Sequence, residues 1–160
     1  MPIKVGDRLP NAKFRVMSAE GPAWKTTDEI FKGKKVVLFA VPGAFTPTCS
    51  DYHLPGFIDH ADQILAKGVD TIACVAVNDH FVMGAWAKAK ETGDKILMLA
   101  DGNGDLARAM GLESDARPWG MGHRSRRYAA VIDDCVVKQL NVDQPGRLEL
   151  SAAEEILKSL

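Results

Sequence analysis

The sequence predicts a single α/β domain in which a central mixed β-sheet is flanked by helices. Three observations support this prediction: a length of 160 residues, alternation of apolar runs with amphipathic segments, and two adjoining strand patterns near the C-terminus. A chain of this length can bury a core without disulfide bonds or a structural metal. Its net charge of -1 excludes a strong general attraction to nucleic acid or anionic membranes. We therefore expect one globular domain over residues 1–160.

The first strand pattern is the apolar, β-branched run KKVVLFAV at residues 34–41, which predicts a strand buried on both faces. From Thr48 to about residue 67, apolar residues recur at spacings of three and four, which predicts an amphipathic helix kinked at Pro55. The alternation continues through residues 69–78 (strand), 80–90 (helix), 95–101 (strand) and 106–110 (short helix).

The last third of the chain predicts a hairpin followed by a helix. RYAAVIDDCVVKQLNV, residues 127–142, is typical of two strands joined at Asp133 and Asp134. SAAEEILKSL predicts a closing helix with Ser151 as N-cap and Glu154 completing a capping box. This order of elements is that of the thioredoxin fold, here preceded by an N-terminal extension of about thirty residues.

Cys49 follows the first predicted strand, in the segment VPGAFTPTCS. We expect Thr46 to be the N-cap and Pro47 the first helical residue, which places the Cys49 sulfur in the first helical turn. A helix N-terminus favours a thiolate by only about 0.3 to 1 kcal/mol, whereas lowering a thiol pKa from about 8.5 to about 6 requires roughly 3.4 kcal/mol. A reactive cysteine here therefore requires a cation from elsewhere, and HRSRRYAAVI, residues 123–132, offers arginines.

The segment PGAFTPTC resembles the active-site signature of the type II (type five) peroxiredoxins. Their pattern Pro-x-x-x-Thr-x-x-Cys is met by Pro42, Thr46 and Cys49. The resemblance continues through LPGF, KGV, VND, LADG and RSRRYA, and so covers nearly the whole chain. It implies a thioredoxin-like fold and the reduction of hydrogen peroxide and alkyl hydroperoxides, with no metal or organic cofactor.

The resemblance also implies a role for each site residue. Cys49 would attack one peroxide oxygen and become a sulfenic acid. Thr46 would hold the peroxide, Pro42 would shield the sulfur from water, and Arg127 would stabilise both the thiolate and the transition state. Arg124, in the same arginine-rich segment, is a second candidate for this cation.

The sulfenic acid must then be reduced, and some relatives use a second cysteine late in the chain. Leu150 stands about where that thiol would be, so we expect an external thiol to reduce Cys49: glutathione with glutaredoxin, or thioredoxin. Cys74 lies within a strand pattern, where a core position is expected and an internal disulfide with Cys49 is the alternative. Cys135 follows the hairpin turn, where we expect it to be structural.

His53 is four residues beyond Cys49 and could face it on the helix, which leaves a Cys-His metal pair or a hydrolase as alternatives. A metal site would need three or four ligands, and no further cluster is evident, so we expect His53 to support the active-site loop. The arginines at residues 124–127 lack the interleaved aromatic residues of a nucleic-acid site. DGNGDL, at residues 101–106, lacks the glycine and glutamate that a calcium loop requires.

A second function class uses the same sulfenic acid as a signal, in a peroxide sensor or a redox-regulated holdase. A thiol-disulfide oxidoreductase is disfavoured because the three cysteines form no Cys-x-x-Cys. MPIKVGDRLP lacks the pattern of a secretory signal, and no apolar run approaches the roughly 18 residues of a membrane span, so we expect a cytoplasmic protein. By resemblance we expect a homodimer that associates through the active-site face, at the VPGAF loop and the loop around Trp119.

Overall fold

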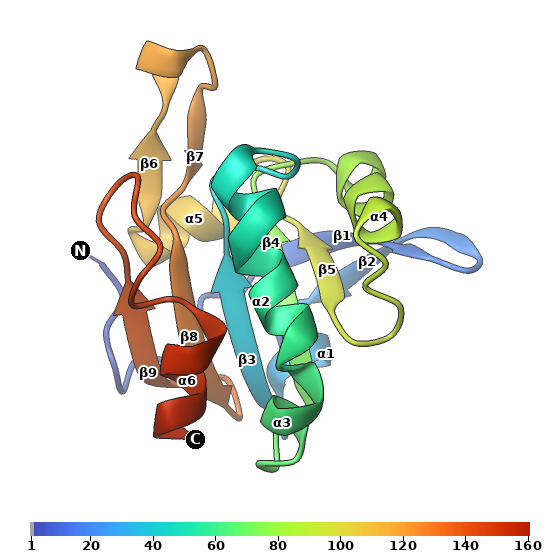
Figure 1. Cartoon of the computed structure of the whole chain (residues 1–160), viewed down its shortest axis with the longest axis vertical. Coiled ribbons are helices and arrows are strands. Elements are labelled where there is room, and N and C mark those ends of the chain that lie inside the picture. The colour runs from blue at the N-terminus through green and yellow to red at the C-terminus, as the bar shows by residue number, and fades with distance from the viewer. Residues whose placement is uncertain (1) are drawn as a thin grey trace.

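The computed structural model describes residues 2–160, and its centre is a seven-stranded mixed sheet with the order β2-β1-β5-β4-β3-β8-β9 (Figure 1). Strands β3, β4 and β5 are parallel, and their neighbours on both sides, β8 and β1, run antiparallel to them. The sheet strands are β1 (Lys13–Ser18), β2 (Gly21–Thr26), β3 (Lys35–Ala40), β4 (Thr71–Ala76), β5 (Leu97–Ala100), β8 (Tyr128–Asp133) and β9 (Val136–Val142).

Helices cover both faces of this sheet. The helices and helical turns are α1 (Thr27–Phe31), a π-helical turn (Cys49–His53), α2 (Leu54–Asp59), α3 (Ala61–Leu65), α4 (His80–Ala89), α5 (Asp105–Met110), a 3-10 turn (Arg117–Trp119) and α6 (Ala153–Ser159). Helices α2, α3, α4 and α6 pack in one core cluster, and α1 and α5 pack in the other (Figure 1). The predicted mixed sheet flanked by helices is thus confirmed.

The central strands are the ones that the continuous apolar runs predict. In β3, Val37 and Phe39 belong to one core cluster and Val36 and Leu38 to the other, because alternate side chains of a strand point to opposite faces. A strand between two layers of helices must be apolar on both faces. The predicted hairpin is also present, since β8 pairs antiparallel with β9.

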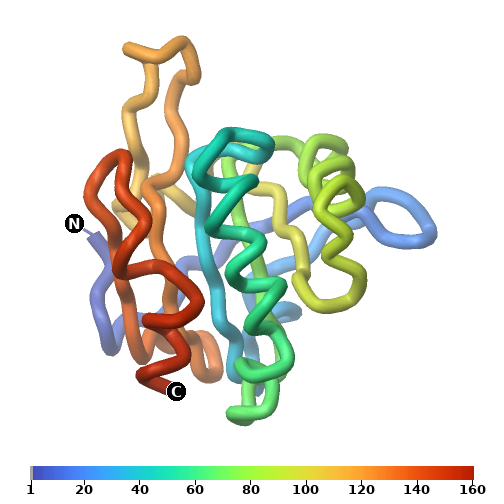
Figure 2. Tube along the Cα trace, in the orientation of Figure 1, coloured from blue at the N-terminus to red at the C-terminus, as the bar shows by residue number. Residues whose placement is uncertain are grey.

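The N-terminal extension forms part of the sheet instead of lying over it. Strands β1 and β2 pair as a hairpin, and β1 joins the sheet by pairing antiparallel with β5, where Arg15 lies opposite Ala100. These two strands were not predicted from the sequence pattern. Figure 2 shows the tip of this hairpin projecting from one side of the molecule.

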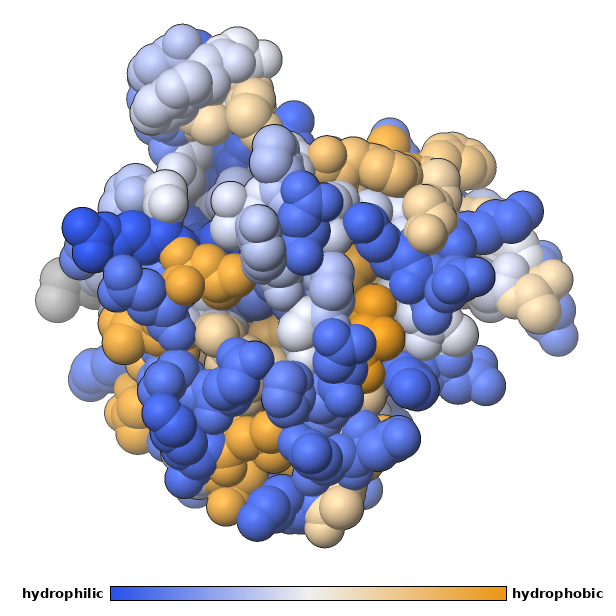
Figure 3. Space-filling model, viewed as in Figure 1, coloured by the Kyte–Doolittle hydropathy of each residue, from blue (hydrophilic) through white to orange (hydrophobic). Residues whose placement is uncertain are grey.

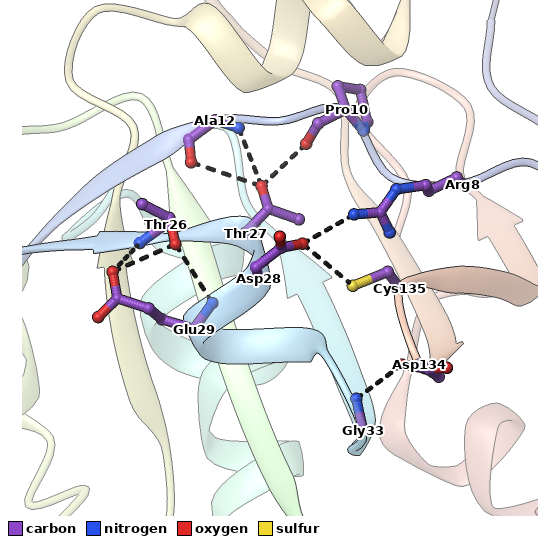
Figure 4. A network of polar contacts seen from close by, with 10 residues as sticks. All are labelled: Arg8, Pro10, Ala12, Thr26, Thr27, Asp28, Glu29, Gly33, Asp134 and Cys135. Atoms are coloured by element: carbon purple, nitrogen blue, oxygen red, sulfur yellow. Dashed lines mark hydrogen bonds and ion pairs between the residues drawn. The ribbon is translucent and has the colours of Figure 1, made fainter.

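Polar contacts link residues of the N-terminal extension to one another and to the turn between β8 and β9 (Figure 4). The Thr27 hydroxyl donates a hydrogen bond to the carbonyl of Pro10 at 2.8 Å. Asp28 accepts one from Arg8 at 2.7 Å and a longer one from the Cys135 thiol at 3.8 Å. Cys135 is buried, which agrees with the structural position expected for it.

Three local predictions were wrong. The helix expected from Thr48 to about residue 67 is divided: a π-helical turn precedes Pro55, and α2 and α3 are separated at His60. Helix α6 begins after Ala152, not Ser151, and has no side-chain cap. The Ser151 hydroxyl is instead oriented toward the carboxylate of Asp143, to which it donates. The capping box with Glu154 is therefore not formed.

A second, two-stranded sheet was also not predicted. It consists of β6 (Glu113–Asp115) and β7 (His123–Ser125), which pair antiparallel, and its tip carries the 3-10 turn. This hairpin projects from the body of the molecule at the end where α2 and α4 begin (Figure 2). Among residues 2–160, no helix is both long enough and apolar enough to span a bilayer.

Candidate active site

Cys49 lies where β3 passes into the helical layer. The chain leaves β3 at Ala40, turns through residues 41–46, and enters a helix at Pro47, so Cys49 is the third helical residue as predicted. This turn is at the carboxyl end of the three parallel strands, where α/β folds usually place their ligands. The Cys49 side chain is fully buried.

Two hydrogen bonds from neighbouring elements hold this turn. The Ala44 amide donates to the Asn78 side-chain oxygen at 2.9 Å, which ties the loop to the segment after β4. The Trp86 indole N–H donates to the Ser50 hydroxyl at 2.7 Å, which ties the first helical turn to α4. Trp86 is completely buried, so its indole N–H has no access to water as an alternative partner. No local spacing pattern identifies these two hydrogen bonds in advance.

Arg127 supplies a cation at the thiol. It directly precedes β8, and the residue is only 9% exposed. Nη2 donates to the Cys49 sulfur at 3.0 Å, and Nη1 donates to Nδ1 of His53 at 2.8 Å. The structure thus joins two residues 78 positions apart in the chain, as the need for a cation beside Cys49 had predicted.

His53 is held between Arg127 and the C-terminal loop. Its Nδ1 accepts from Arg127, and its Nε2 lies 3.0 Å from the carbonyl oxygen of Ser151. Because a guanidinium can only donate and a carbonyl can only accept, the ring must be the neutral tautomer with its proton on Nε2. Burial, reinforced by the charge of Arg127, lowers the pKa of His53 to about 3, so the ring stays neutral at physiological pH.

This arrangement gives both ring nitrogens of His53 a partner. Its Nδ1 lone pair is occupied by Arg127, so the ring is not available as a base for the thiol of Cys49. Within residues 2–160, no group of three or more His, Cys, Asp or Glu side chains is placed to hold a metal ion. His53 holds Arg127 through Nδ1, a position compatible with the supporting role expected from the sequence.

Thr46 occupies the predicted position before the first helical residue, but its hydroxyl does not cap the helix. It donates to the carbonyl of Gly43 at 2.6 Å, so its oxygen lone pairs remain as acceptors. The Thr46 carbonyl accepts from the amide of Ser50 at 2.8 Å and closes the first helical turn. Pro42, which begins this loop, is half-buried.

Arg124, the second candidate cation, does not bond to Cys49. Its guanidinium donates to the carbonyls of Met121 at 2.8 Å and Val77 at 3.1 Å, and so links the β6-β7 hairpin to the end of β4. A side chain at Gly43 would come within 3.5 Å of this guanidinium, so Arg124 lies against the active-site loop. Its position is one of support for that loop.

Cys74 lies in β4 opposite Phe39 of β3 and is fully buried, which confirms the expected core position. Burial, together with the nearby Cys49, raises the pKa of the Cys74 thiol well above its usual range. Cys74 is therefore protonated at neutral pH. All three cysteines are free thiols.

Comparison with known proteins agrees with this site. Residues 4–157 match the Redoxin family. The chain is 53% identical to "Peroxiredoxin-2E-2, chloroplastic" of Oryza sativa subsp. japonica, over 99% of this chain and 72% of that protein. It is 45% identical to "Peroxiredoxin-2B" of Arabidopsis thaliana, over 99% of both chains. The chain belongs to the type II peroxiredoxins.

A solved structure of the same family shows the same fold. Reduced Prx3 of Vibrio vulnificus in complex with hydrogen peroxide is 54% identical and superposes with a TM-score of 0.94 over 98% of both chains. The thioredoxin-like fold expected from the order of elements is confirmed. This peroxiredoxin is accordingly a thiol peroxidase, which reduces peroxides and is itself reduced again by a thiol.

The position expected for a late resolving thiol is part of an exposed loop in this peroxiredoxin. Leu150 lies between β9 and α6 and is 51% exposed. Its amide donates to the carboxylate of Asp143, and its carbonyl accepts from Asn141. A leucine cannot form a disulfide, so an intramolecular partner at this position is excluded.

Proposed function

We propose that Cys49 is the nucleophile of peroxide reduction and that Arg127 is the group that activates it. The observation that carries this proposal is the distance of 3.0 Å between Nη2 of Arg127 and the Cys49 sulfur. A hydrogen bond to a charged group contributes about 1.5 to 3 kcal/mol, and a helix N-terminus about 0.3 to 1 kcal/mol. Together they approach the roughly 3.4 kcal/mol that converting an ordinary thiol into a reactive one requires.

In the proposed reaction the Cys49 thiolate attacks the terminal oxygen of the peroxide along the O–O bond. The S–O bond forms while the O–O bond breaks, and the electron pair of that bond leaves with the alkoxide or hydroxide, which takes up a proton. The sulfur is oxidised to sulfenic acid and the peroxide is reduced to an alcohol or water.

Thr46 and Pro42 complete the proposed site. Because the Thr46 hydroxyl already donates to Gly43, its oxygen can accept the O–H of a hydroperoxide and orient it. Arg127 has donors on both nitrogens, and a peroxide oxygen near the sulfur would share them as negative charge develops. Half-buried Pro42 would keep bulk water from the sulfur.

For the reduction of the sulfenic acid we propose an external thiol, with glutathione and glutaredoxin favoured and thioredoxin as the alternative. A first thiol would condense with Cys49 to a mixed disulfide, releasing water, and a second thiol would free Cys49 and leave as part of a disulfide. The support is that Leu150 occupies the late position and that Cys74 is protonated and buried in the core. A protonated thiol is a poor nucleophile.

The decisive experiment measures peroxide consumption with each electron donor in turn. We expect many turnovers with glutathione and glutaredoxin, none in Cys49→Ser, and normal turnover in Cys74→Ser. Loss of turnover in Cys74→Ser, or a Cys49–Cys74 disulfide trapped in the wild type, would overturn external resolution. A single stoichiometric oxidation under excess of both donors would instead identify the peroxide sensor or holdase.

We also propose that the protein forms a homodimer through its active-site face. Large apolar side chains are exposed at this end of the molecule: Phe45 (52%) in the loop before Cys49, Phe81 (64%) at the start of α4, and Trp119 (76%) at the hairpin tip. Figure 3 shows apolar residues gathered at the upper edge of the view, near the start of α4. Sedimentation of the wild type and of Phe81→Asp tests this, and an unchanged dimer in the variant would contradict association through this face.

A cytoplasmic location stays a prediction from the sequence. The name of the rice relative places that protein in the chloroplast.

A further inference from the structure

Asp143 is a buried carboxylate behind the active site that has no part in the reaction described above. It directly follows β9 and is 3% exposed. Its two oxygens accept the backbone amides of Glu149 at 3.2 Å, Leu150 at 2.7 Å and Ser151 at 3.1 Å. The Ser151 hydroxyl donates to the same carboxylate. Asp143 therefore closes the loop of residues 143–151 on itself.

This closed loop fixes one carbonyl group that the active site uses. Both the amide and the hydroxyl of Ser151 are held by Asp143, and the residue is completely buried. Its carbonyl is therefore held in one direction, toward Nε2 of His53 at 3.0 Å. The bond orients the imidazole and keeps its Nδ1 lone pair directed at Arg127.

A second connection joins Asp143 to the same arginine. The Asp143 amide donates to the carbonyl of Arg127 at 3.0 Å, so both the backbone and the side chain of Arg127 are held from Asp143. Ser151 and His53 are each at most 1% exposed. Water cannot readily replace a hydrogen bond that is lost between these buried groups. A change in the bond between Asp143 and Ser151 should therefore alter the orientation of His53 and, through it, of Arg127.

We propose that Asp143 is a positioning residue for Arg127, which acts through Ser151 and His53 to direct Nη2 of the guanidinium at the Cys49 sulfur. The inference rests on the proposed role of Cys49 as nucleophile. It assigns to the loop of residues 143–151 a function at the thiol, although the Asp143 carboxylate bonds to the loop and not to Arg127. The Asp143 backbone bonds to the carbonyl of Arg127 and accepts from the Arg126 guanidinium. A purely structural role for Asp143 would affect the stability of the fold without affecting the thiol selectively.

The first test is Asp143→Asn, which keeps the shape of the side chain. An amide has one accepting oxygen, so its NH₂ group would face an N–H or O–H donor of the loop. We expect the rate of Cys49 alkylation by iodoacetamide at neutral pH to fall about three- to tenfold, the equivalent of one hydrogen bond. The reaction is followed on the Cys49 peptide by mass spectrometry, together with the thiolate absorbance.

Asp101→Asn is the matched control. Asp101 is also a buried carboxylate, 4% exposed, and accepts the amides of Leu106 and Ala107 at 3.1 Å at the start of α5. Helix α5 packs on the sheet face opposite to Cys49. This control variant should lose thermal stability as Asp143→Asn does but keep its Cys49 alkylation rate. Equal effects of the two variants on the alkylation rate would overturn the proposal.

A double-mutant cycle with His53→Leu tests whether Asp143 acts through His53. If it does, the alkylation rate of the double variant equals that of His53→Leu alone, because the connection from Asp143 to Arg127 through His53 is already lost. Additive losses, or no loss in Asp143→Asn, would overturn the proposal. Should Asp143→Asn not fold, the same cycle is made with Ser151→Ala, which removes one donor to Asp143, and the same outcomes decide. Alkylation needs no peroxide. A wild type without peroxidase turnover would therefore refute the proposed function, while the alkylation rates of the double-mutant cycle would still show whether Asp143 acts through His53.

Discussion

Replacing Arg127 by glutamine removes the charge beside Cys49 and the two-nitrogen donor that joins Cys49 to His53. The guanidinium donates to Cys49 at 3.0 Å and to His53 at 2.8 Å, and the whole residue is 9% exposed, so solvent screens these contacts little. A hydrogen bond to a charged partner contributes about 1.5 to 3 kcal/mol, and 1.4 kcal/mol corresponds to a factor of ten. We therefore expect Arg127→Gln to slow the reaction of Cys49 with peroxide about 10- to 150-fold.

The melting temperature should change much less than the rate. Within residues 2–160 the guanidinium bonds to the Cys49 sulfur and to an imidazole but to no carboxylate, so only the proposed thiolate offsets its burial. Removing the charge relieves its desolvation, but it also leaves the buried Nδ1 of His53 without its donor. Because these two effects oppose each other, we expect the melting temperature of Arg127→Gln to change by only a few degrees, on the order of 1 kcal/mol.

The assay is a single-turnover reaction of reduced protein with hydrogen peroxide, in which the remaining Cys49 thiol is quantified after quenching. Arg124→Gln is the control, because Arg124 comes from the same segment but donates only to the carbonyls of Met121 and Val77. We expect the rate of Arg127→Gln to lie at least about tenfold below that of the control. A rate within about threefold of the wild type, or equal losses in the two variants, would refute the assignment of Arg127.

Three further predictions concern the surroundings of the thiol. Because the pKa of His53 is lowered from 6.5 to about 3, below pH 6.5 the unfolded chain binds a proton that the folded protein does not. The free energy of unfolding should therefore fall by up to about 1.4 kcal/mol per pH unit as the pH is lowered from about 6.5 to 3. Measured by urea unfolding at several pH values, the free energy of His53→Gln should depend less steeply on pH than that of the wild type, and an equal pH dependence would contradict this. Thr46→Val should lower kcat/KM for hydrogen peroxide on the order of a hundredfold while Thr46→Ser recovers most of it, since only the hydroxyl can orient the peroxide. Trp86→Phe leaves the Ser50 hydroxyl without its donor and should lower the free energy of unfolding by about 1 to 3 kcal/mol, whereas the same change at Trp24, which is 56% exposed, should stay within about 0.5 kcal/mol in chemical denaturation.

The central strands could be predicted because they lie between two helical layers. Burial on both faces makes β3 and β4 continuous apolar runs, a pattern that depends only on neighbouring residues. The β1-β2 hairpin lacks this signal. Strand β2 is an edge strand with the sequence GPAWKT, in which each residue is exposed or half-buried. It is held by pairing along β1. Strand β1 in turn pairs with β5, where Arg15 lies opposite Ala100, and a pairing between residues so far apart in the sequence leaves no local pattern.

The same distinction applies to the active site. Pro42, Thr46 and Cys49 belong to one short segment, so their relation could be predicted from the change of strand into helix. Ser151 shows the limit of such reasoning: its spacing to Glu154 satisfies a capping box, yet its hydroxyl bonds to Asp143. A capping serine accepts from a backbone N–H of the helix, whereas here the charged carboxylate of Asp143 accepts from the Ser151 hydroxyl and orients it away from the helix start. No spacing rule for helix ends includes this partner.

The π-helical turn at Cys49 makes the length of one short segment a functional property. The Leu54 amide bonds to the carbonyl of Cys49, five residues earlier, so this turn holds one residue more than an α-helical turn. The thiol and the imidazole at its two ends meet two different nitrogens of one guanidinium. Deleting Tyr52, whose side chain is 69% exposed, would swing His53 around the helix axis by about 100°. A protein engineer can therefore change which residue stands at the surface of this turn, but not how many residues it contains.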